Sequence, residues 1–188
     1  MIDYEKIIDK YYGKESRLRT ILTVHSRLVA DKALLCARRA ALDVDMQFVE
    51  EAAMLHDIGI IRCDAPDIFC HGSLPYICHG VEGRKILEEE GLPRHALVCE
   101  RHTGAGLSID DIRRQNLPLP LRDMTPKSLE EKLVCYADKF YSKSGDITRE
   151  KPLEKVILSM QRHGEDTLER FLELHRLFGA PAESPFKI

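Results

Sequence analysis

Residues 53–59 read Ala-Met-Leu-His-Asp-Ile-Gly and end an apolar segment that has the periodicity of a helix. His56 and Asp57 are adjacent, so on a helix their side chains project about 100° apart. Both can reach one atom only if that atom lies over the helix end. A metal ion is the obvious candidate, because imidazole nitrogen and carboxylate oxygen together suit borderline or hard divalent metals. A His-Asp pair also occurs by chance, so this interpretation depends on the rest of the chain.

The composition is that of an ordinary globular protein, with 44% hydrophobic and 31% charged residues. A chain of 188 residues is long enough for one domain with a proper core, so we expect residues 1–188 to form a single domain. The net charge of −3 gives no electrostatic reason to bind nucleic acid. The apolar runs are too short for a membrane span, and the N-terminus has no signal-peptide core. We therefore expect a cytoplasmic protein whose six cysteines are reduced thiols.

Helical periodicity recurs along most of the chain, and the short Val/Ile runs lie inside it. The pattern predicts an all-α fold, a single helical bundle. Helices are expected over residues 4–12, 16–41, 45–59, 77–90, 94–103, 125–140, 153–163 and 165–178. The Gly at 59 is expected to end the third helix, and Thr125-Pro126 to begin the sixth as N-cap and N1 residues. Residues 62–76 are expected to form a loop, and residues 107–124 an irregular crossing segment.

Several polar residues fall on apolar faces or at helix ends. His25 lies on or beside the stripe expected to face inward on the second helix, which includes Leu28 and Leu35. A hydrogen-bonded core histidine is the alternative reading of His25. Asp138 lies within a hydrophobic helix, where a carboxylate is costly unless it is paired or bound to a cation. His102 in a last helical turn could simply favour the helix dipole.

The loop over residues 62–76 and the residues just beyond it are rich in soft or borderline metal ligands, namely Cys63, Cys70, His71, Cys78 and His79. A separate zinc site is one hypothesis for them. Their spacing lacks the compact C-x2-C pair of structural zinc sites, so the alternative is a loop with incidental thiols. Near the C-terminus, His163 and His175 are expected to be surface residues on two structural helices.

Six candidates on five expected helices together resemble the ligand pattern of the HD superfamily of metal-dependent phosphohydrolases. The pattern is a first His, an adjacent His-Asp pair and a distant Asp, with two further histidines in members that hold two metals. In this chain these residues are His25, His56, Asp57, His79, His102 and Asp138. Residues 56–59 match the His-Asp-Ile-Gly form of the motif. The likeness covers residues 16–145, and we expect the helices over 153–178 to pack on that core.

The resemblance implies two divalent metals that share Asp57 as a bridge. His25, His56 and Asp138 would serve one ion, and His79 and His102 the other. A metal-activated water would attack a phosphate ester or anhydride, often on a nucleotide. Mixed nitrogen and oxygen ligands suit Fe, Mn, Co, Ni or Zn.

Two basic residues beside the ligands, Lys139 and Arg101, could hold the substrate phosphate. We therefore expect a small phosphorylated substrate. We expect neither nucleic acid nor a membrane as a partner, and a homo-oligomer is possible. In the cyclic-dinucleotide phosphodiesterases of this superfamily a Lys follows the motif. Here Ile60 stands in that place, which argues against that substrate. Dinucleoside tetraphosphate hydrolases of HD type are the better analogy.

Two other functions stay open from the sequence. The same six ligands in the same order occur in HD-fold mixed-valence di-iron oxygenases, which oxidise a C–H bond with O2. A catalytically idle metal-binding or regulatory module is the third possibility. It is weakened because no second, sensory or output domain fits within 188 residues.

Overall fold

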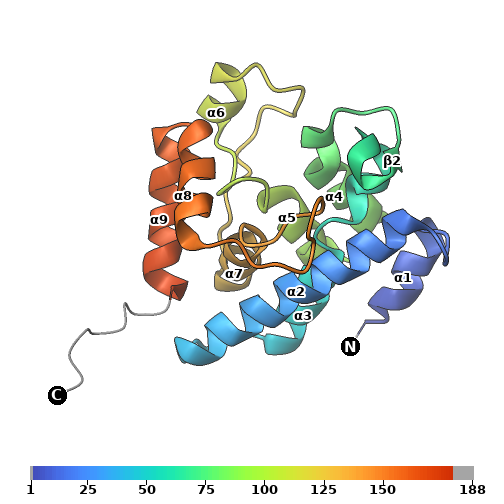
Figure 1. Ribbon diagram of the computed structural model, residues 1–188, viewed down its shortest axis with the longest axis horizontal. Coiled ribbons are helices and arrows are strands. Elements are labelled where there is room, and N and C mark those ends of the chain that lie inside the picture. The colour runs from blue at the N-terminus through green and yellow to red at the C-terminus, as the bar shows by residue number, and fades with distance from the viewer. Residues whose placement is uncertain (1, 180–188) are drawn as a thin grey trace.

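The computed structural model describes residues 2–179, which fold almost entirely as helices (Figure 1). The α-helices of this part of the chain are α1 (Tyr4–Tyr11), α2 (Arg17–Arg39), α3 (Met46–Leu55), α4 (His79–Glu89), α5 (Pro93–Arg101), α6 (Ile109–Arg114), α7 (Leu129–Asp138), α8 (Leu153–Arg162) and α9 (Glu165–Phe178). Three short 3-10 helices are η1 (Ile58–Arg62), η2 (Pro66–Ile68) and η3 (Tyr76–Cys78). The predicted all-α class is confirmed.

The long helix α2 crosses the molecule, with α3 and α7 packed against it (Figure 1). Its first turn is capped by Ser16, whose side chain accepts a hydrogen bond from the Arg19 amide. Asp45 caps α3 in the same way through the Phe48 amide, as the sequence predicted. None of the helices within residues 2–179 has the length and apolar character needed to cross a membrane.

Two apolar clusters divide the interior along α2. One contains Leu22 together with side chains of α1, η1, α4 and α5, and the other contains Val29 together with side chains of α3, α7, α8 and α9. His25 lies between these two positions on α2. On the neighbouring segment, Met54 belongs to the second cluster and Ile58 to the first. The polar pair between them therefore lies where the two clusters meet, sheltered on both sides.

The inward face of α2 differs from the expected stripe. Leu35 is 41% exposed, whereas Ala33 and Cys36 are buried. Residues seven positions apart do not stay on the same face of a straight helix with 3.6 residues per turn. Leu35 therefore no longer lies on the buried face in the last turns of α2.

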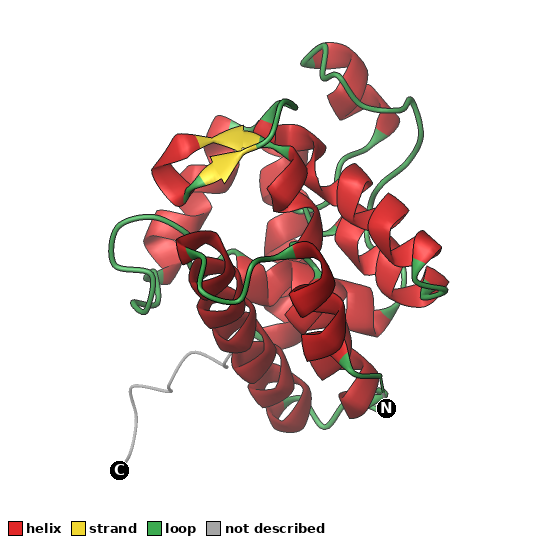
Figure 2. Cartoon of the chain, turned by 90° about the vertical axis from the view of Figure 1, so that its right-hand side faces the viewer, coloured by secondary structure: helices red, strands yellow, loops and turns green. Residues whose placement is uncertain are grey.

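Two connecting segments contain more structure than expected. Within the predicted loop, β1 (Asp64–Ala65) pairs antiparallel with β2 (Cys70–His71), shown in yellow in Figure 2. Within the predicted irregular segment, α6 is held by a capping box between Ser108 and Asp111. Local side-chain caps of this kind stabilise even a six-residue helix.

The prediction for the start of α7 was wrong. The helix begins at Leu129 with Ser128 as its cap, and Thr125 is not a helix cap. The Thr125 amide and hydroxyl instead donate to the Asp123 carboxylate, which forms a local turn. This turn keeps Thr125 and Pro126 outside the helix.

Gly59 does not end a helix either. Helix α3 ends at Leu55, and Gly59 lies within η1, where it meets α4. A Cβ atom at this position would lie 2.1 Å from the His79 carbonyl oxygen and 2.3 Å from the Gly83 amide nitrogen. The missing side chain thus lets two backbones approach closely.

The C-terminal helix α9 packs on α7 and α2, and α8 packs on α9. Phe171 of α9 is fully buried against Tyr136 of α7 and against Phe140, which follows α7. His163 is exposed as expected, but the prediction that His175 is a surface residue was wrong. His175 is half-buried beside these rings, with Nδ1 2.9 Å from the Tyr136 hydroxyl.

Candidate metal centre

The fold brings together all six residues of the predicted ligand set. They come from five helices or their ends, and all are buried. His25 lies mid-helix on α2, whereas the others lie where a helix begins or ends: His56 follows α3, Asp57 precedes η1, His79 begins α4, His102 follows α5 and Asp138 ends α7. A helix end can point a side chain inward without burying a further turn of backbone. Residues 113 positions apart in sequence are thereby placed in contact.

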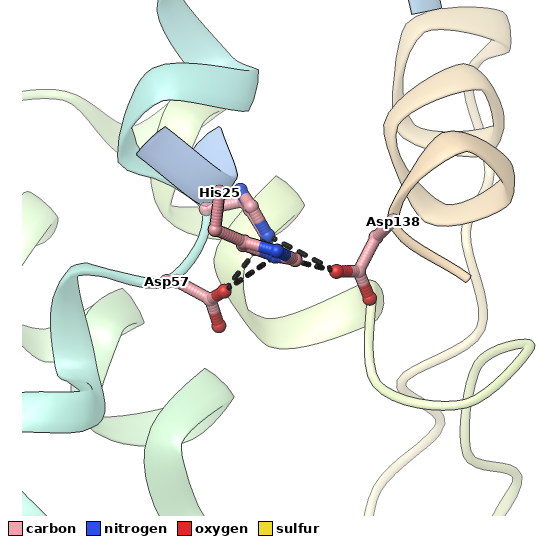
Figure 3. A group of neighbouring side chains, drawn as sticks. His25, Asp57 and Asp138 are labelled. Carbon is pink, nitrogen blue, oxygen red and sulfur yellow. Dashed lines mark hydrogen bonds and ion pairs between the residues drawn. The ribbon is translucent and has the colours of Figure 1, made fainter. Parts of the chain in front are cut away.

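The first group contains His25, His56, Asp57 and Asp138, which offer ligand atoms within 4.8 Å of one another. His25 Nε2 lies 2.9 Å from Asp138 Oδ1 and 3.2 Å from Asp57 Oδ2 (Figure 3). His56 Nε2 lies 3.0 Å from the same Asp57 oxygen. Two nitrogens and two carboxylates thus converge on one point.

The second group contains Asp57, His79 and His102, again within 4.8 Å of one another. His79 Nε2 and His102 Nε2 lie 3.5 Å and 3.4 Å from Asp57 Oδ1. The two Asp57 oxygens therefore face different groups, Oδ2 the first and Oδ1 the second. Asp57 is therefore shared by both groups.

Three of the histidines are oriented by their own backbone. Each places Nδ1 near the carbonyl oxygen three residues earlier, at 2.6 Å for His56 and 2.7 Å for His79 and for His102. A carbonyl oxygen can only accept, so Nδ1 carries the proton and Nε2 presents a lone pair to the centre. The Nε2 atoms of His79 and His102 lie 3.0 Å apart, and two such lone pairs face each other favourably only with a cation nearby.

Burial controls the charge of these histidines. It lowers the pKa of His79 to about 3, with a further contribution from His102, and it also lowers the pKa of His102. Both rings are therefore neutral, which is the form that binds a metal. Burial opposes a charge on His56 as well, but Asp57 and Asp138 raise its pKa to about 9. A positive charge at this Nε2, from a proton or a metal ion, is thus favoured.

The residues present fit a bound cation. His56 Nε2 and Asp57 Oδ1 are buried, and within the described part of the chain they have no hydrogen-bond partner of acceptable geometry. Buried polar atoms without partners are rare because they cost free energy. Four imidazoles with two carboxylates form a donor set that suits Fe, Mn, Co, Ni or Zn.

Two lysines reach the carboxylates of the centre. Lys139 Nζ lies 2.6 Å from Asp138 Oδ2 and donates to the His102 carbonyl oxygen at 3.0 Å. Lys143 Nζ lies 2.6 Å from Asp57 Oδ2. Burial opposes these charges, yet His56 and Lys143 hold the pKa of Asp57 well below its usual range. Both carboxylates are therefore ionised and ready to bind a cation.

Sequence reasoning missed Lys143. It follows Asp138 by five residues and lies beyond the end of α7, so neither helical periodicity nor the six-residue pattern points to it. The only signal was its place in a short segment rich in Lys, Tyr and Ser after Asp138.

Arg101, the other basic candidate, is engaged elsewhere. Its Nη1 atom lies 3.0 Å from both carboxylate oxygens of Glu131, in the first turn of α7. The contacts of the guanidinium thus join α5 to α7. Arg101 thus forms an ion pair with Glu131 in this structure, and its expected contact with phosphate stays a prediction.

The zinc hypothesis for the cysteine-rich loop gains no support. Among residues 2–179, groups with metal-ligand spacing are limited to the two around Asp57. Cys63 and Cys70 are buried thiols, and burial raises the pKa of each, to about 12 for Cys63 and about 11 for Cys70. Buried thiols with raised pKa values are inert.

Comparison with known proteins identifies the family. The model of the HD domain matches residues 23–142, a segment that contains all six residues of the two groups. No solved structure matches the chain.

Three curated relatives are similar over part of their length. The chain is 30% identical over 154 residues to the tRNA (cytidine(56)-2'-O)-methyltransferase of Thermoplasma volcanium, a match that covers 81% of this chain and 40% of the relative. It is 32% identical over 132 residues to the enzyme of the same name from Picrophilus torridus, covering 70% of this chain and 34% of the relative. It is 39% identical over 105 residues to an uncharacterized protein of Methanocaldococcus jannaschii, a match that covers 55% of this chain and 54% of the relative.

The matched segments thus span between about a third and about a half of these relatives. The family match, in contrast, covers more than half of this chain and includes both groups of candidate ligands. The chain therefore belongs to the HD domain family.

Proposed function

We propose that this protein is a metal-dependent phosphohydrolase that cleaves a phosphate ester or anhydride of a small molecule, in particular a nucleotide. The observation that carries the proposal is the Asp57 carboxylate, which turns one oxygen to each of two buried ligand groups. His25, His56 and Asp138 would hold one divalent ion, and His79 and His102 the other. Bound ions of this kind lower the pKa of a water molecule and offset phosphate charge.

The chain's own groups prepare the site for an anionic substrate. The carbonyl contacts of His56, His79 and His102 hold each ring so that Nε2 points inward. Lys139 and Lys143 add positive charge beside Asp138 and Asp57. The apolar clusters on both sides keep bulk water away, which strengthens every charge interaction in the centre.

Two of the relatives are named as enzymes that methylate tRNA. We do not propose that activity here, because more than half of each of those proteins lies outside the match. Because these relatives are named for an RNA substrate, a phosphorylated RNA belongs among the substrates to be tested. The expected absence of nucleic acid as a partner therefore stays a prediction.

A direct test measures phosphate release from nucleoside mono- and polyphosphates, dinucleotides and a phosphorylated RNA, with Mn, Fe, Co or Ni present. We expect release from at least one small phosphate compound, and loss of that release in excess chelator with recovery on metal addition. Activity that continues unchanged after verified metal removal would contradict the proposal. O2 consumption by the iron-loaded protein without phosphate release would instead support the di-iron oxygenase.

A further inference from the structure

A cleft of about 380 Å³ opens beside the metal centre. Lys143 belongs to both: it lines the cleft, and its Nζ atom lies 2.6 Å from Asp57 Oδ2. Tyr76 also belongs to both, because it lines the cleft and its ring stacks on His79 with centroids 4.7 Å apart. Two lining residues of the cleft therefore contact candidate ligands: Lys143 contacts Asp57, and Tyr76 contacts His79.

The cleft is lined by two basic side chains and one acidic side chain. Its charged lining residues are Lys143, Lys151 and Asp67. Lys151 Nζ donates to the Tyr141 carbonyl oxygen at 2.9 Å, and a carbonyl does not neutralise an ammonium group. A phosphate in the cleft would thus meet the ammonium group of Lys151, and beside it that of Lys143, which is paired with Asp57 in this structure.

The remaining walls are aromatic and apolar. Tyr76 and Tyr141 contribute phenol rings, and Pro66 and Ile68 contribute aliphatic surface. Flat rings of this kind bind a nucleobase or a similar planar group by stacking. The volume is near the lower end of the range for small-molecule sites, which matches a ligand about the size of one nucleoside.

We propose that Lys143 and Lys151 form the phosphate-binding wall of a substrate cleft that accepts a phosphomonoester whose organic part is about the size of one nucleoside. This inference rests on the proposed function and specifies its substrate class. Lysine suits the role because a compact charge on a flexible four-carbon chain can follow a phosphate group. Tyr141 would contact the organic part.

The test is calorimetric binding of adenosine 5′-monophosphate to the metal-containing protein, with inorganic phosphate, adenosine and a short 5′-phosphorylated RNA as comparison probes. Phosphate release is followed in the same samples, so that turnover is not mistaken for binding. We expect the monophosphate to bind more tightly than adenosine or inorganic phosphate. Equal or tighter binding of the RNA would overturn the size limit and with it the proposal.

Variants then locate the phosphate. Lys143→Gln and Lys151→Gln should each weaken binding of the monophosphate at least ~10-fold, the effect of one lost charge-assisted hydrogen bond. Lys32→Gln is the matched control, because Lys32 and Lys143 have equally exposed side chains, 14% each, and each lies 2.6 Å from a carboxylate. Lys32 does not line this cleft, so the control should bind like wild type.

Tyr141→Leu separates the two halves of the ligand. It should weaken binding of the monophosphate and leave binding of inorganic phosphate unchanged. Loss of the fold would weaken both. Circular dichroism and metal analysis accompany every variant, and metal content should stay constant. Wild-type affinity in both lysine variants overturns the proposal. The proposal is also overturned if Lys143→Gln loses affinity for the monophosphate only because it has lost metal, while Lys151→Gln binds the monophosphate normally.

These outcomes are distinct from failure of the proposed function. If wild type binds the monophosphate as described but releases no phosphate with any metal, the hydrolase proposal fails and the cleft assignment stands. If phosphate is released and both lysine variants keep the wild-type KM and affinity, the cleft assignment alone fails.

Discussion

Asp57 is the residue on which both ligand groups depend. One oxygen faces His25 and His56, and the other faces His79 and His102. Because the side chain is fully buried, water cannot replace it as a partner for either group. The consequences of changing single residues should therefore differ according to whether they belong to one group or to both.

Removal of the second group should leave the first. The double change His79→Ala and His102→Ala is expected to remove about one metal ion per chain, since a site reduced to one carboxylate and water loses most of its affinity. Elemental analysis of folded protein is the measurement. His71→Ala with His163→Ala, two exposed histidines outside the groups, is the matched control and should keep its full metal content. Full metal content in the first double variant would mean that His79 and His102 are not ligands.

The change Asp57→Asn should be more severe, although it preserves shape. It removes the negative charge shared by both groups and the partner of Lys143, so both ions should be lost. Asp138→Asn offers the comparison, because Asp138 belongs to the first group alone. Metal counts in the two variants, taken side by side, check the prediction. Equal losses would show that Asp57 is not a bridge.

A histidine outside the centre should make stability depend on pH. Burial lowers the pKa of His95, whose Nε2 lies 3.3 Å from Glu51 Oε2. The unfolded chain, with an ordinary pKa near ~6.5, then binds more protons than the folded chain below that pH. Stability should therefore fall as the pH drops below ~6.5. Urea unfolding of wild type and His95→Gln at several pH values should show a smaller fall in the variant, and parallel curves would refute this.

At the scale of the elements, the contact between η1 and α4 sets the position of His79. Gly59 makes this contact possible, because its Cα faces the His79 carbonyl and the Gly83 backbone. Helix α4 also packs closely on α5, which ends beside His102. The second ligand group is thus positioned by backbone-to-backbone packing.

Gly59→Ala should disturb this arrangement. The new methyl group would lie 2.1 Å from a backbone oxygen, so η1 and α4 must separate. We expect the free energy of unfolding to fall by about 1–3 kcal/mol, as at other overpacked sites. Chemical denaturation measures it. Gly13→Ala is the control, because a Cβ there meets nothing within 4 Å, and a similar loss in the control would contradict the explanation.

At the scale of the whole molecule, the fold has support that does not involve metal. We propose that the described residues form one domain, since α8 and α9 pack on the same apolar cluster as α2, α3 and α7. Phe171 of α9 and Leu133 of α7 are both fully buried in that cluster. The carboxylates of the centre are meanwhile compensated by Lys139 and Lys143.

Metal removal should therefore leave the protein folded but less stable. A ligand that binds only the native state adds about 2.7 kcal/mol when its concentration is 100 times Kd, and this increment should disappear in chelator. Far-UV circular dichroism should be unchanged, whereas the Tm should fall and recover with added metal. Loss of helical signal on chelation would show instead that the core depends on the ions.

The helical class and the approximate position of most helices could be predicted from the amino-acid sequence, because periodicity and capping are local properties. Ser16 and Asp45 act through neighbours a few residues away. The six candidate ligands also followed from the sequence, through resemblance to a family whose spacing they match. Their convergence is now seen in the structure, and their role as ligands stays a proposal.

Which side chains meet could be seen only in the folded structure. Lys143 reaches Asp57 from 86 positions away by a turn after α7, and Arg101 is drawn to Glu131 on another helix. Gly59 is the last residue of the His-Asp-Ile-Gly motif in the sequence, but its close contact with the α4 backbone appears only in the structure. No local pattern encodes these contacts, because each depends on how elements distant in sequence pack against one another.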